Sequence, residues 1–510
     1  MSRPLVAFAV LIGALCGLAP LAAMVVRVDV SELAALIESR HLRLFARTLA
    51  YGGGVALLAT LLGAPYGWLV ARSDLPGARW LRPLGLVPLC LPPMLIAMVW
   101  TVLADVRGAP AACLVSVLAT WPLVALLTAR AAERVDGRLV DAARLAGGRR
   151  AVLAAEVPLI APAIAVGACL AFVFTANDFS VPDYVSWVGT KFSVYADQVF
   201  ASWKIDQSAG EAVATALPLI ALTLASLLPA LALRRRGALA SLRGDFRAPA
   251  RLELGALRWP ACAACAGLVL VSAGVPIARL VWETGGGSRG FAAAHVASAF
   301  GRALELARGD LRNSLVWAAA AATAATALGL VIGHALERAR HGRWFEPLAL
   351  LPLAVPAVLF GIGVIAAWNR PGLERFYDGG GLVVALYVGR FLAFPVLVVS
   401  AAVASLDPGG EEAARLAGAG PARRLASIVA PPLRGALALS WSLVFVLCLR
   451  ELDATILVPA ANHTAMFRIF NAVHFGRDDF VAALALMVVF LTLLPGLVWA
   501  VARGRTEVRA

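Results

Sequence analysis

Charged residues are scarce in this chain of 510 residues: Asp, Glu, Lys and Arg make up 15% of it, whereas soluble domains average about 25%. The scarcity argues against an ordinary soluble enzyme, because 61% of the residues are apolar and the mean hydropathy is +0.82. Apolar runs of about 20 residues, each long enough to cross a bilayer, fill most of the sequence. They leave no stretch large enough for a soluble catalytic domain, so we expect this chain not to be an enzyme.

Lysine is nearly absent, because the chain contains two lysines, Lys191 and Lys204. A Walker A loop needs Gly-Lys followed by Ser or Thr, and neither lysine follows a glycine, so the sequence contains no such loop. Disulfides are not indicated either, because the seven cysteines all fall inside apolar runs. Cys262 and Cys265 form a Cys-x-x-Cys sequence, which we interpret as small apolar side chains rather than a redox pair.

The net charge of +14 does not indicate nucleic-acid binding. The basic residues gather in short loops between apolar runs, as the positive-inside rule requires of a multi-pass inner-membrane protein. Their distribution favours an orientation with both termini in the cytoplasm. The six histidines form no close ligand pair with neighbouring carboxylates or thiolates, so no metal site is predicted.

The apolar runs predict an all-α integral membrane protein with about twelve transmembrane helices. Six lie in each half of the chain, and an even number of spans gives both halves the same membrane orientation. The predicted spans are residues 5–26, 48–71, 84–104, 111–129, 157–176, 212–233, 259–278, 313–335, 347–369, 379–405, 435 to about 459, and 480–501.

The two halves repeat each other. Residues 86–92 (LVPLCLP) match residues 350–356 (LLPLAVP), and the hexapeptide AARLAG occurs at both 142–147 and 413–418. We therefore divide the chain into two transmembrane halves, 1–245 and 246–510. A parallel repeat of this kind predicts a pseudo-two-fold axis along the membrane normal, with a binding or translocation path between the halves.

Two predicted cytoplasmic loops, at about residues 130–157 and 405–433, each carry an acid-Ala-Ala-x-x-x-Gly sequence. An acid favours the positive end of a short helix, the alanines leave a flat face, and the glycine ends the helix. One such loop alone is equally well explained as a solvated amphipathic helix. Two identical hexapeptides in otherwise diverged halves favour a shared contact with a two-fold partner, in which each helix lies in a groove. The residues concerned are Asp141, Ala142, Ala143 and Gly147 in the first loop, and Glu412, Ala413, Ala414 and Gly418 in the second.

These loops resemble the "EAA" loops of fused permease subunits of ATP-binding-cassette importers. The second loop matches the motif with Ala430 in place of Leu, whereas the first has Asp141 for Glu and its Pro158 lies only eleven residues after Gly147. The resemblance implies the type I importer permease fold, with both loops acting as coupling helices on two copies of a cytoplasmic ATPase. It also implies an external solute-binding protein as partner, no cofactor on this chain, and ATP and Mg on the ATPase.

The transported solute is less clearly indicated. Residues 450–455 (RELDAT) resemble a stretch of ferric-iron permeases, so ferric iron is the first expectation, with thiamine, polyamine or phosphonate-type solutes as alternatives. Arg390 lies inside a predicted span, where a charged side chain normally faces protein or water. Arg390, Arg450, Glu451 and Asp453 are candidates for a pathway. We favour a structural interpretation, in which Arg390 pairs with an acid or with backbone carbonyls and the other three form an ion-paired helix end.

An ion-gradient-driven secondary transporter of six plus six helices is the main rival. Such carriers usually need several ionisable residues deep within their spans, and this chain offers essentially Arg390. They also have no reason to repeat an acid-Ala-Ala-x-x-x-Gly loop.

Overall fold

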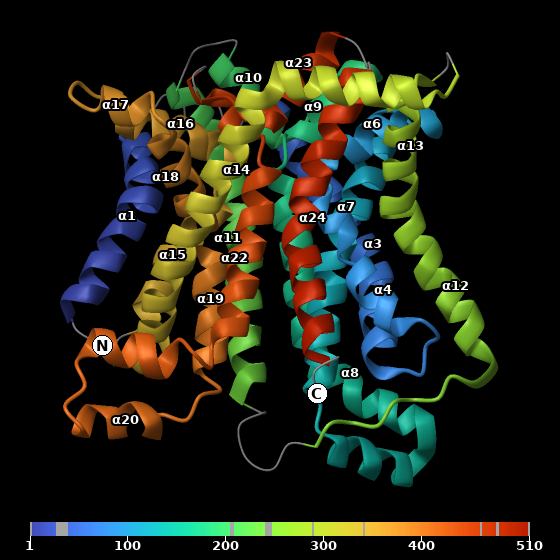
Figure 1. Cartoon of the computed structure of the whole chain (residues 1–510), viewed down its shortest axis with the longest axis vertical. Coiled ribbons are helices and arrows are strands. Elements are labelled where there is room, and N and C mark those ends of the chain that lie inside the picture. The colour runs from blue at the N-terminus through green and yellow to red at the C-terminus, as the bar shows by residue number, and fades with distance from the viewer. Residues whose placement is uncertain are drawn as a thin grey trace. The chain divides into compact units, whose positions relative to one another are not determined.

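A computed structural model describes residues 3–26, 39–204, 209–239, 247–287, 290–339, 342–459, 462–475 and 479–507. Within these ranges every regular element longer than a single bridge is a helix (Figure 1), which confirms the all-α prediction. Eight helices are long and apolar enough to span a membrane, and four bent helix pairs raise the number to twelve if each pair is one span. The twelve predicted spans all fall on these helices and pairs.

The chain divides into two compact units, and each contains helical segments from the opposite half of the sequence. The first unit comprises residues 1–33, 202–214 and 283–510, and the second comprises residues 34–201 and 215–282. The first unit contains α1 (Arg3–Val25), α14 (Ala293–Arg338), α15 (Phe345–Ala354), α16 (Ala357–Trp368), α17 (Glu374–Tyr377), α18 (Gly380–Phe391), α19 (Ala393–Val403), α20 (Gly409–Leu416), α21 (Pro421–Arg424), α22 (Arg434–Leu449), α23 (Ala465–Phe475) and α24 (Asp479–Glu507). The second contains α3 (Ser39–Arg72), α4 (Ala78–Leu84), α5 (Val87–Cys90), α6 (Pro93–Leu103), α7 (Gly108–Glu133), α8 (Gly137–Asn177), α9 (Ser180–Val188), most of α10 (Tyr195–Lys204) and of α11 (Ala209–Leu239), α12 (Arg258–Val269) and nearly all of α13 (Val275–Thr284).

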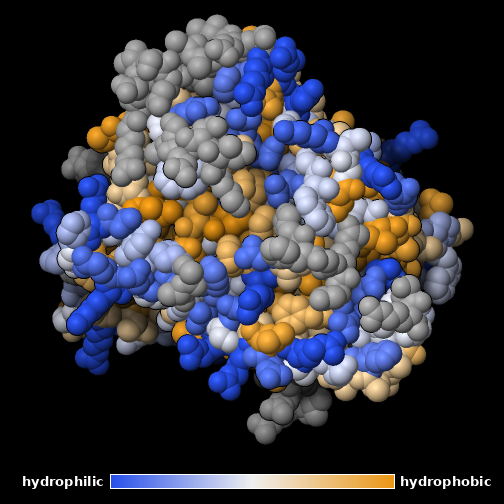
Figure 2. Space-filling model, turned by 90° about the horizontal axis from the view of Figure 1, so that it is seen from above, coloured by the Kyte–Doolittle hydropathy of each residue, from blue (hydrophilic) through white to orange (hydrophobic). Residues whose placement is uncertain are grey.

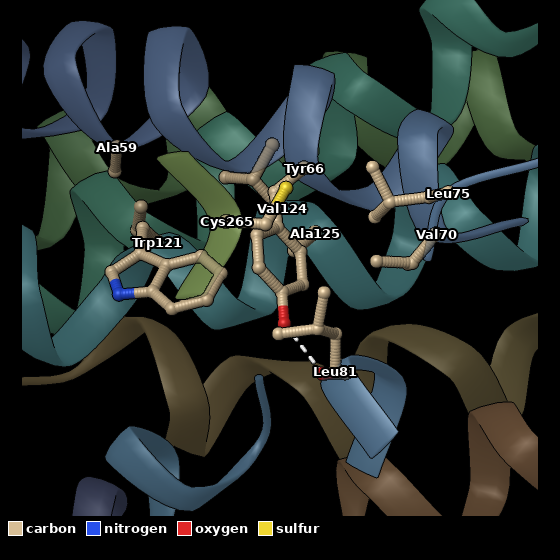
Figure 3. Packing of buried hydrophobic residues seen from close by; sticks show 10 residues of the cluster. Ala59, Tyr66, Val70, Leu75, Leu81, Trp121, Val124, Ala125 and Cys265 are labelled. Atoms are coloured by element: carbon tan, nitrogen blue, oxygen red, sulfur yellow. Dashed lines mark hydrogen bonds between the residues drawn. The ribbon is translucent and has the colours of Figure 1, made fainter. Parts of the chain in front are cut away.

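The exchanged helices are packed into the cores of their units. In the first unit α1 crosses α18 so closely that a side chain on Gly389 would overlap the carbonyl oxygen of Cys16. In the second unit Cys265 of α12 lies in a cluster with Tyr66 and Trp121 (Figure 3), where the Tyr66 hydroxyl donates to the Leu81 carbonyl at 2.5 Å. The compact units therefore do not coincide with the sequence halves 1–245 and 246–510.

The two matching proline segments break their spans, which the prediction of continuous helices missed. The helices on either side meet at 92° between α5 and α6 and at 110° between α15 and α16. Leu91 and Val355 are extended, with ψ of 127° and 135°, because the residue before a proline is sterically excluded from the helical region. The third break lies between α18 and α19, whose axes differ in direction by 48°. Pro395 contributes to this bend, because it has no amide hydrogen to donate to the Phe391 carbonyl oxygen.

The predicted span from 435 to about 459 extended too far at its C-terminal end. Helix α22 ends at Leu449, and the chain then turns through residues 450–458. The cause is the run of charged residues from Arg450 to Asp453, which the structure accommodates in a turn rather than in a helix. Figure 2 shows one face of the protein, on which hydrophilic side chains are spread with apolar ones between them.

Both units use a glycine pair four residues apart to bring two helices together. Gly63 and Gly67 of α3 lie against α7, and Gly329 and Gly333 of α14 lie against α19, where a side-chain carbon on Gly333 would be 2.9 Å from the Val396 carbonyl oxygen. Small residues at this spacing allow close helix contact in membranes, where packing rather than hydrophobic burial drives association.

We expect Gly67→Ala to lower stability by about 1–3 kcal/mol, because its methyl group would overlap the Ala125 carbonyl oxygen. Gly53→Ala on the same helix is the matched control, since its added carbon has nothing within 4 Å. The measurement is the thermal unfolding midpoint of the purified chain in detergent. Equal midpoints for the two variants would show that this contact does not hold α3 against α7.

Candidate functional site: two exposed loop helices

The first loop helix occupies residues 137–146 at the start of α8. Asp136 caps it, accepting a hydrogen bond from the Arg138 amide at 2.9 Å. Gly147 (φ −169°, ψ 23°) and Gly148 (φ 65°, ψ −150°) interrupt the helix, which then resumes toward Asn177. The backbone of Gly148 lies in a region that is essentially accessible to glycine alone, so this residue, which sequence analysis did not single out, forms the turn. The doubled glycine was the available signal.

The second loop helix is α20, which ends at Leu416. Gly418 follows with φ +79°, the left-handed conformation that glycine adopts at helix ends. The chain then forms α21 and a π-helical turn, Leu425–Val429, and bends by 93° into α22. The first loop has no counterpart of this bend, because its Pro158 and Pro162 lie within α8, whereas Pro431 and Pro432 are consecutive.

The two loop helices expose the same residues. Leu145 is 90% exposed and Leu416 is 85% exposed, and these leucines occupy the same place in the repeated hexapeptide. Their neighbours follow the same pattern: Ala142 and Ala413 are exposed, Ala143 and Ala414 are half-buried, and Gly147 and Gly418 are exposed. Among the described residues no leucine is more exposed than these two.

The acids of the two loops have different neighbours. Asp141 forms an ion pair with Arg247 at 3.2 Å, and Glu412 is exposed. The preceding residue, Glu411, joins the second loop helix to the end of α14, where its carboxylate lies 2.8 Å from His334 Nε2 and accepts from Arg338 Nε at 3.3 Å. Sequence analysis missed these three residues, because residues 334–338 and 411 are far apart in the chain.

Arg390 and Glu451 form a buried ion pair within the first unit. Arg390 Nε, in the last turn of α18, donates to Glu451 Oε2 at 3.3 Å, and the residues are 7% and 9% exposed. The other oxygen, Oε1, accepts from the Ala454 amide at 2.9 Å. Of the four pathway candidates, these two are brought together, while Arg450 and Asp453 flank Glu451 in the turn after α22. Among the described residues, no group of three His, Cys, Asp or Glu is arranged to hold a metal ion.

Comparison with known proteins gives two matches to one family within the chain. Residues 63–236 and residues 325–505, together more than half of the chain, match the family described as binding-protein-dependent transport system inner membrane component. Each match contains one loop helix and one proline-broken span.

Individual relatives are permeases named for different solutes. The putrescine transport system permease protein PotI of Escherichia coli is 30% identical over 184 residues, which cover 34% of this chain and 65% of the relative. The molybdenum transport system permease protein ModB of Escherichia coli is 31% identical over 148 residues, 24% of this chain and 65% of the relative. PhnV of Salmonella paratyphi A, named for 2-aminoethylphosphonate transport, is 30% identical over 155 residues, 30% of this chain and 57% of the relative. The chain thus spans less than two thirds of each relative's length.

Proposed function

Because the chain belongs to the family of binding-protein-dependent transport system inner membrane components, we propose that it is the permease subunit of an ATP-binding-cassette importer. Membership confirms the predictions of a multi-pass inner-membrane protein and of a transport subunit rather than an enzyme. The proposal adds that the chain moves a small solute by alternating access, using ATP and Mg bound by a separate ATPase.

The observation that carries the proposal is the pair of loop helices with matching exposure. In the repeated hexapeptide of each loop helix, the leucine (Leu145 and Leu416) and the first alanine (Ala142 and Ala413) are exposed at equivalent positions. Two equivalent surfaces on one chain fit a partner that is itself two-fold, so we propose that each docks onto one of two ATPase copies. Movement of the ATPases toward each other would then move both loop helices and open the path to a loaded external binding protein.

Alternating access requires that movement of a loop helix reaches the spans. The second loop helix is joined to α14 through Glu411, His334 and Arg338. Arg338 also donates to the carbonyl oxygens of Val403, the last residue of α19, at 3.4 Å and of Leu406 at 2.8 Å. A displacement of α20 therefore acts on the cytoplasmic ends of both α14 and α19. The broken spans α5–α6 and α15–α16 provide points at which the helices on either side can move separately.

For the solute, ferric iron stays our first proposal, supported by the resemblance of residues 450–455 to ferric-iron permeases. Polyamine or phosphonate-type solutes are the second candidate, favoured by relatives named for putrescine and 2-aminoethylphosphonate transport. Thiamine, the remaining alternative, has no relative among these to favour it.

Uptake by vesicles that contain this chain, its ATPase and its binding protein would distinguish the solutes. We expect labelled ferric iron to accumulate when ATP is enclosed with the ATPase, and not when ATP is replaced by ADP. Accumulation of putrescine or 2-aminoethylphosphonate instead, with iron excluded, would reject the iron assignment and keep the importer.

A further inference from the structure

The segment that follows the junction of the two halves, residues 247–254, is bound to the first loop helix and to the end of α3. We propose that this strap, as we call residues 247–254, positions the first loop helix and joins its movement to that of α3. The inference rests on the proposed function, because it assigns the strap a role in coupling ATP hydrolysis to transport. It concerns residues of the second compact unit alone.

Backbone hydrogen bonds attach the strap to α3. The amide of Leu252 donates to the Arg72 carbonyl at 2.7 Å, and the amide of Asp74 donates to the Leu252 carbonyl at 3.1 Å. These bonds form the parallel bridge between Ser73 and Leu252. Such bonds do not depend on side-chain rotamers, so the strap moves with the end of α3.

Arg72 adds a buried polar connection between three segments. Its side chain is 2% exposed and forms an ion pair with Glu156 of α8, with Nε donating to Oε1 at 3.0 Å. The same guanidinium donates to the Ala250 carbonyl oxygen at 3.0 Å. Trp68 Nε1 also donates to Glu156, at 2.9 Å. A buried guanidinium shared between a carboxylate and the strap fixes α3, α8 and the strap together, because loss of one partner would leave a buried charge unsatisfied.

The strap also contacts the first loop helix directly. The amide of Gly137, the first residue of that helix, donates to the Arg247 carbonyl at 2.8 Å, and the Arg247 side chain pairs with Asp141. Leu252 is 6% exposed and packs in one cluster with Val140 of the loop helix and Val152 of α8. A side chain on Gly137 would approach the strap backbone within 3.2 Å, so glycine allows this close contact.

The two loop helices are therefore attached in different ways. Glu411 ties α20 directly to His334 and Arg338 of α14. In the first loop the position equivalent to Glu411 is Val140, which cannot form an ion pair and instead packs on Leu252. The strap thus takes the place of the direct connection, and Asp141, which replaces the usual Glu, is paired with Arg247 of the strap.

Hydrogen–deuterium exchange on the purified chain in detergent tests the positioning without any partner. Leu252→Ala removes the apolar contact, and we expect amides of residues 139–146 to exchange at least tenfold faster, with α20 unchanged as an internal reference. Arg251→Ala, an exposed arginine of the same segment, is the control. Unchanged exchange of residues 139–146 in Leu252→Ala would overturn the proposal.

Transport by the complex with ATPase and binding protein tests the coupling role. We expect Arg247→Asp to raise the number of ATP molecules hydrolysed per solute at least twofold, and Arg247→Lys, which keeps the charge opposite Asp141, to leave that number close to the value of the unaltered chain. A ratio equal to that of Arg251→Ala in all variants would reject this role for the strap. If the unaltered complex shows no ATP-dependent uptake, the proposed function fails instead, and the exchange experiment still decides whether the strap positions the helix.

Discussion

Truncation of both exposed leucines, Leu145→Ala with Leu416→Ala, is expected to weaken association with the ATPase about a thousandfold and to abolish ATP-dependent uptake. We expect each leucine to be a central anchor of the interface, and truncation of such a hot-spot residue costs about 2 kcal/mol or more, which is about 30-fold in affinity. The two positions lie on separate loop helices, so their effects should add. Binding of the purified ATPase to the detergent-solubilised chain measures the loss directly.

Folding should be unaffected by these substitutions, because the leucines are 90% and 85% exposed and alanine is a good helix former. Leu304→Ala is the matched control, since Leu304 is 54% exposed on α14 and precedes His334, which contacts the second loop helix, by 30 residues on the same helix. Each single variant should lose about half of the binding free energy lost by the double variant. Normal ATPase binding by the double variant would remove the loop helices from the docking surface.

Removal of one member of the Arg390–Glu451 pair should have the largest effect on stability. Glu451→Ala would leave the guanidinium buried without its counter-charge, which costs about 3–5 kcal/mol, whereas replacing both residues with apolar ones of similar size is often nearly neutral. We therefore expect Glu451→Ala to lower the thermal midpoint strongly, and Arg390→Met with Glu451→Leu to restore most of it. Arg107→Ala, which breaks an exposed pair with Asp105, should change stability by less than about 1 kcal/mol.

Uptake by the folded double variant separates the two interpretations of the pair. If Arg390 and Glu451 only hold the turn after α22 against α18, a double variant that folds should also transport. Loss of uptake with folding and ATPase binding intact would place the pair on the solute pathway. A double variant as unstable as Glu451→Ala would show that the unpaired buried charge is not what destabilises the single variant.

The repeat and the positions of the spans were predictable because each depends on a short, continuous stretch of sequence. Apolar runs of about 20 residues mark spans by length alone, and the hexapeptide at 142–147 and 413–418 marks equivalent loops. The breaks at Leu91 and Val355 had a visible signal in the prolines that follow them, but the apolar length of the run outweighed it. No such signal shows that α1 packs in the unit formed mainly by the second half of the sequence, or that α12 packs in the unit formed mainly by the first half. An apolar helix does not specify which apolar surface it meets.

The sequence indicated the two loop segments, but it singled out neither the exposed Leu145 and Leu416 nor the contacts that hold the loop helices. The attachment of Glu411 to His334, of Asp141 to Arg247 and of Arg390 to Glu451 depends on segments brought together by folding. A single sequence contains no information about such pairs beyond charge. The position of Arg390 inside a span did indicate that its side chain needs a polar partner. A carboxylate was one of the two expected kinds of partner, the other being backbone carbonyls.

Transport by reconstituted vesicles tests the central claim most directly. Vesicles that contain the chain, its ATPase and its binding protein should accumulate the solute with ATP present and no ion gradient, and vesicles without the ATPase should not. Accumulation by the chain alone, driven by a proton or sodium gradient, would contradict an ATP-driven importer.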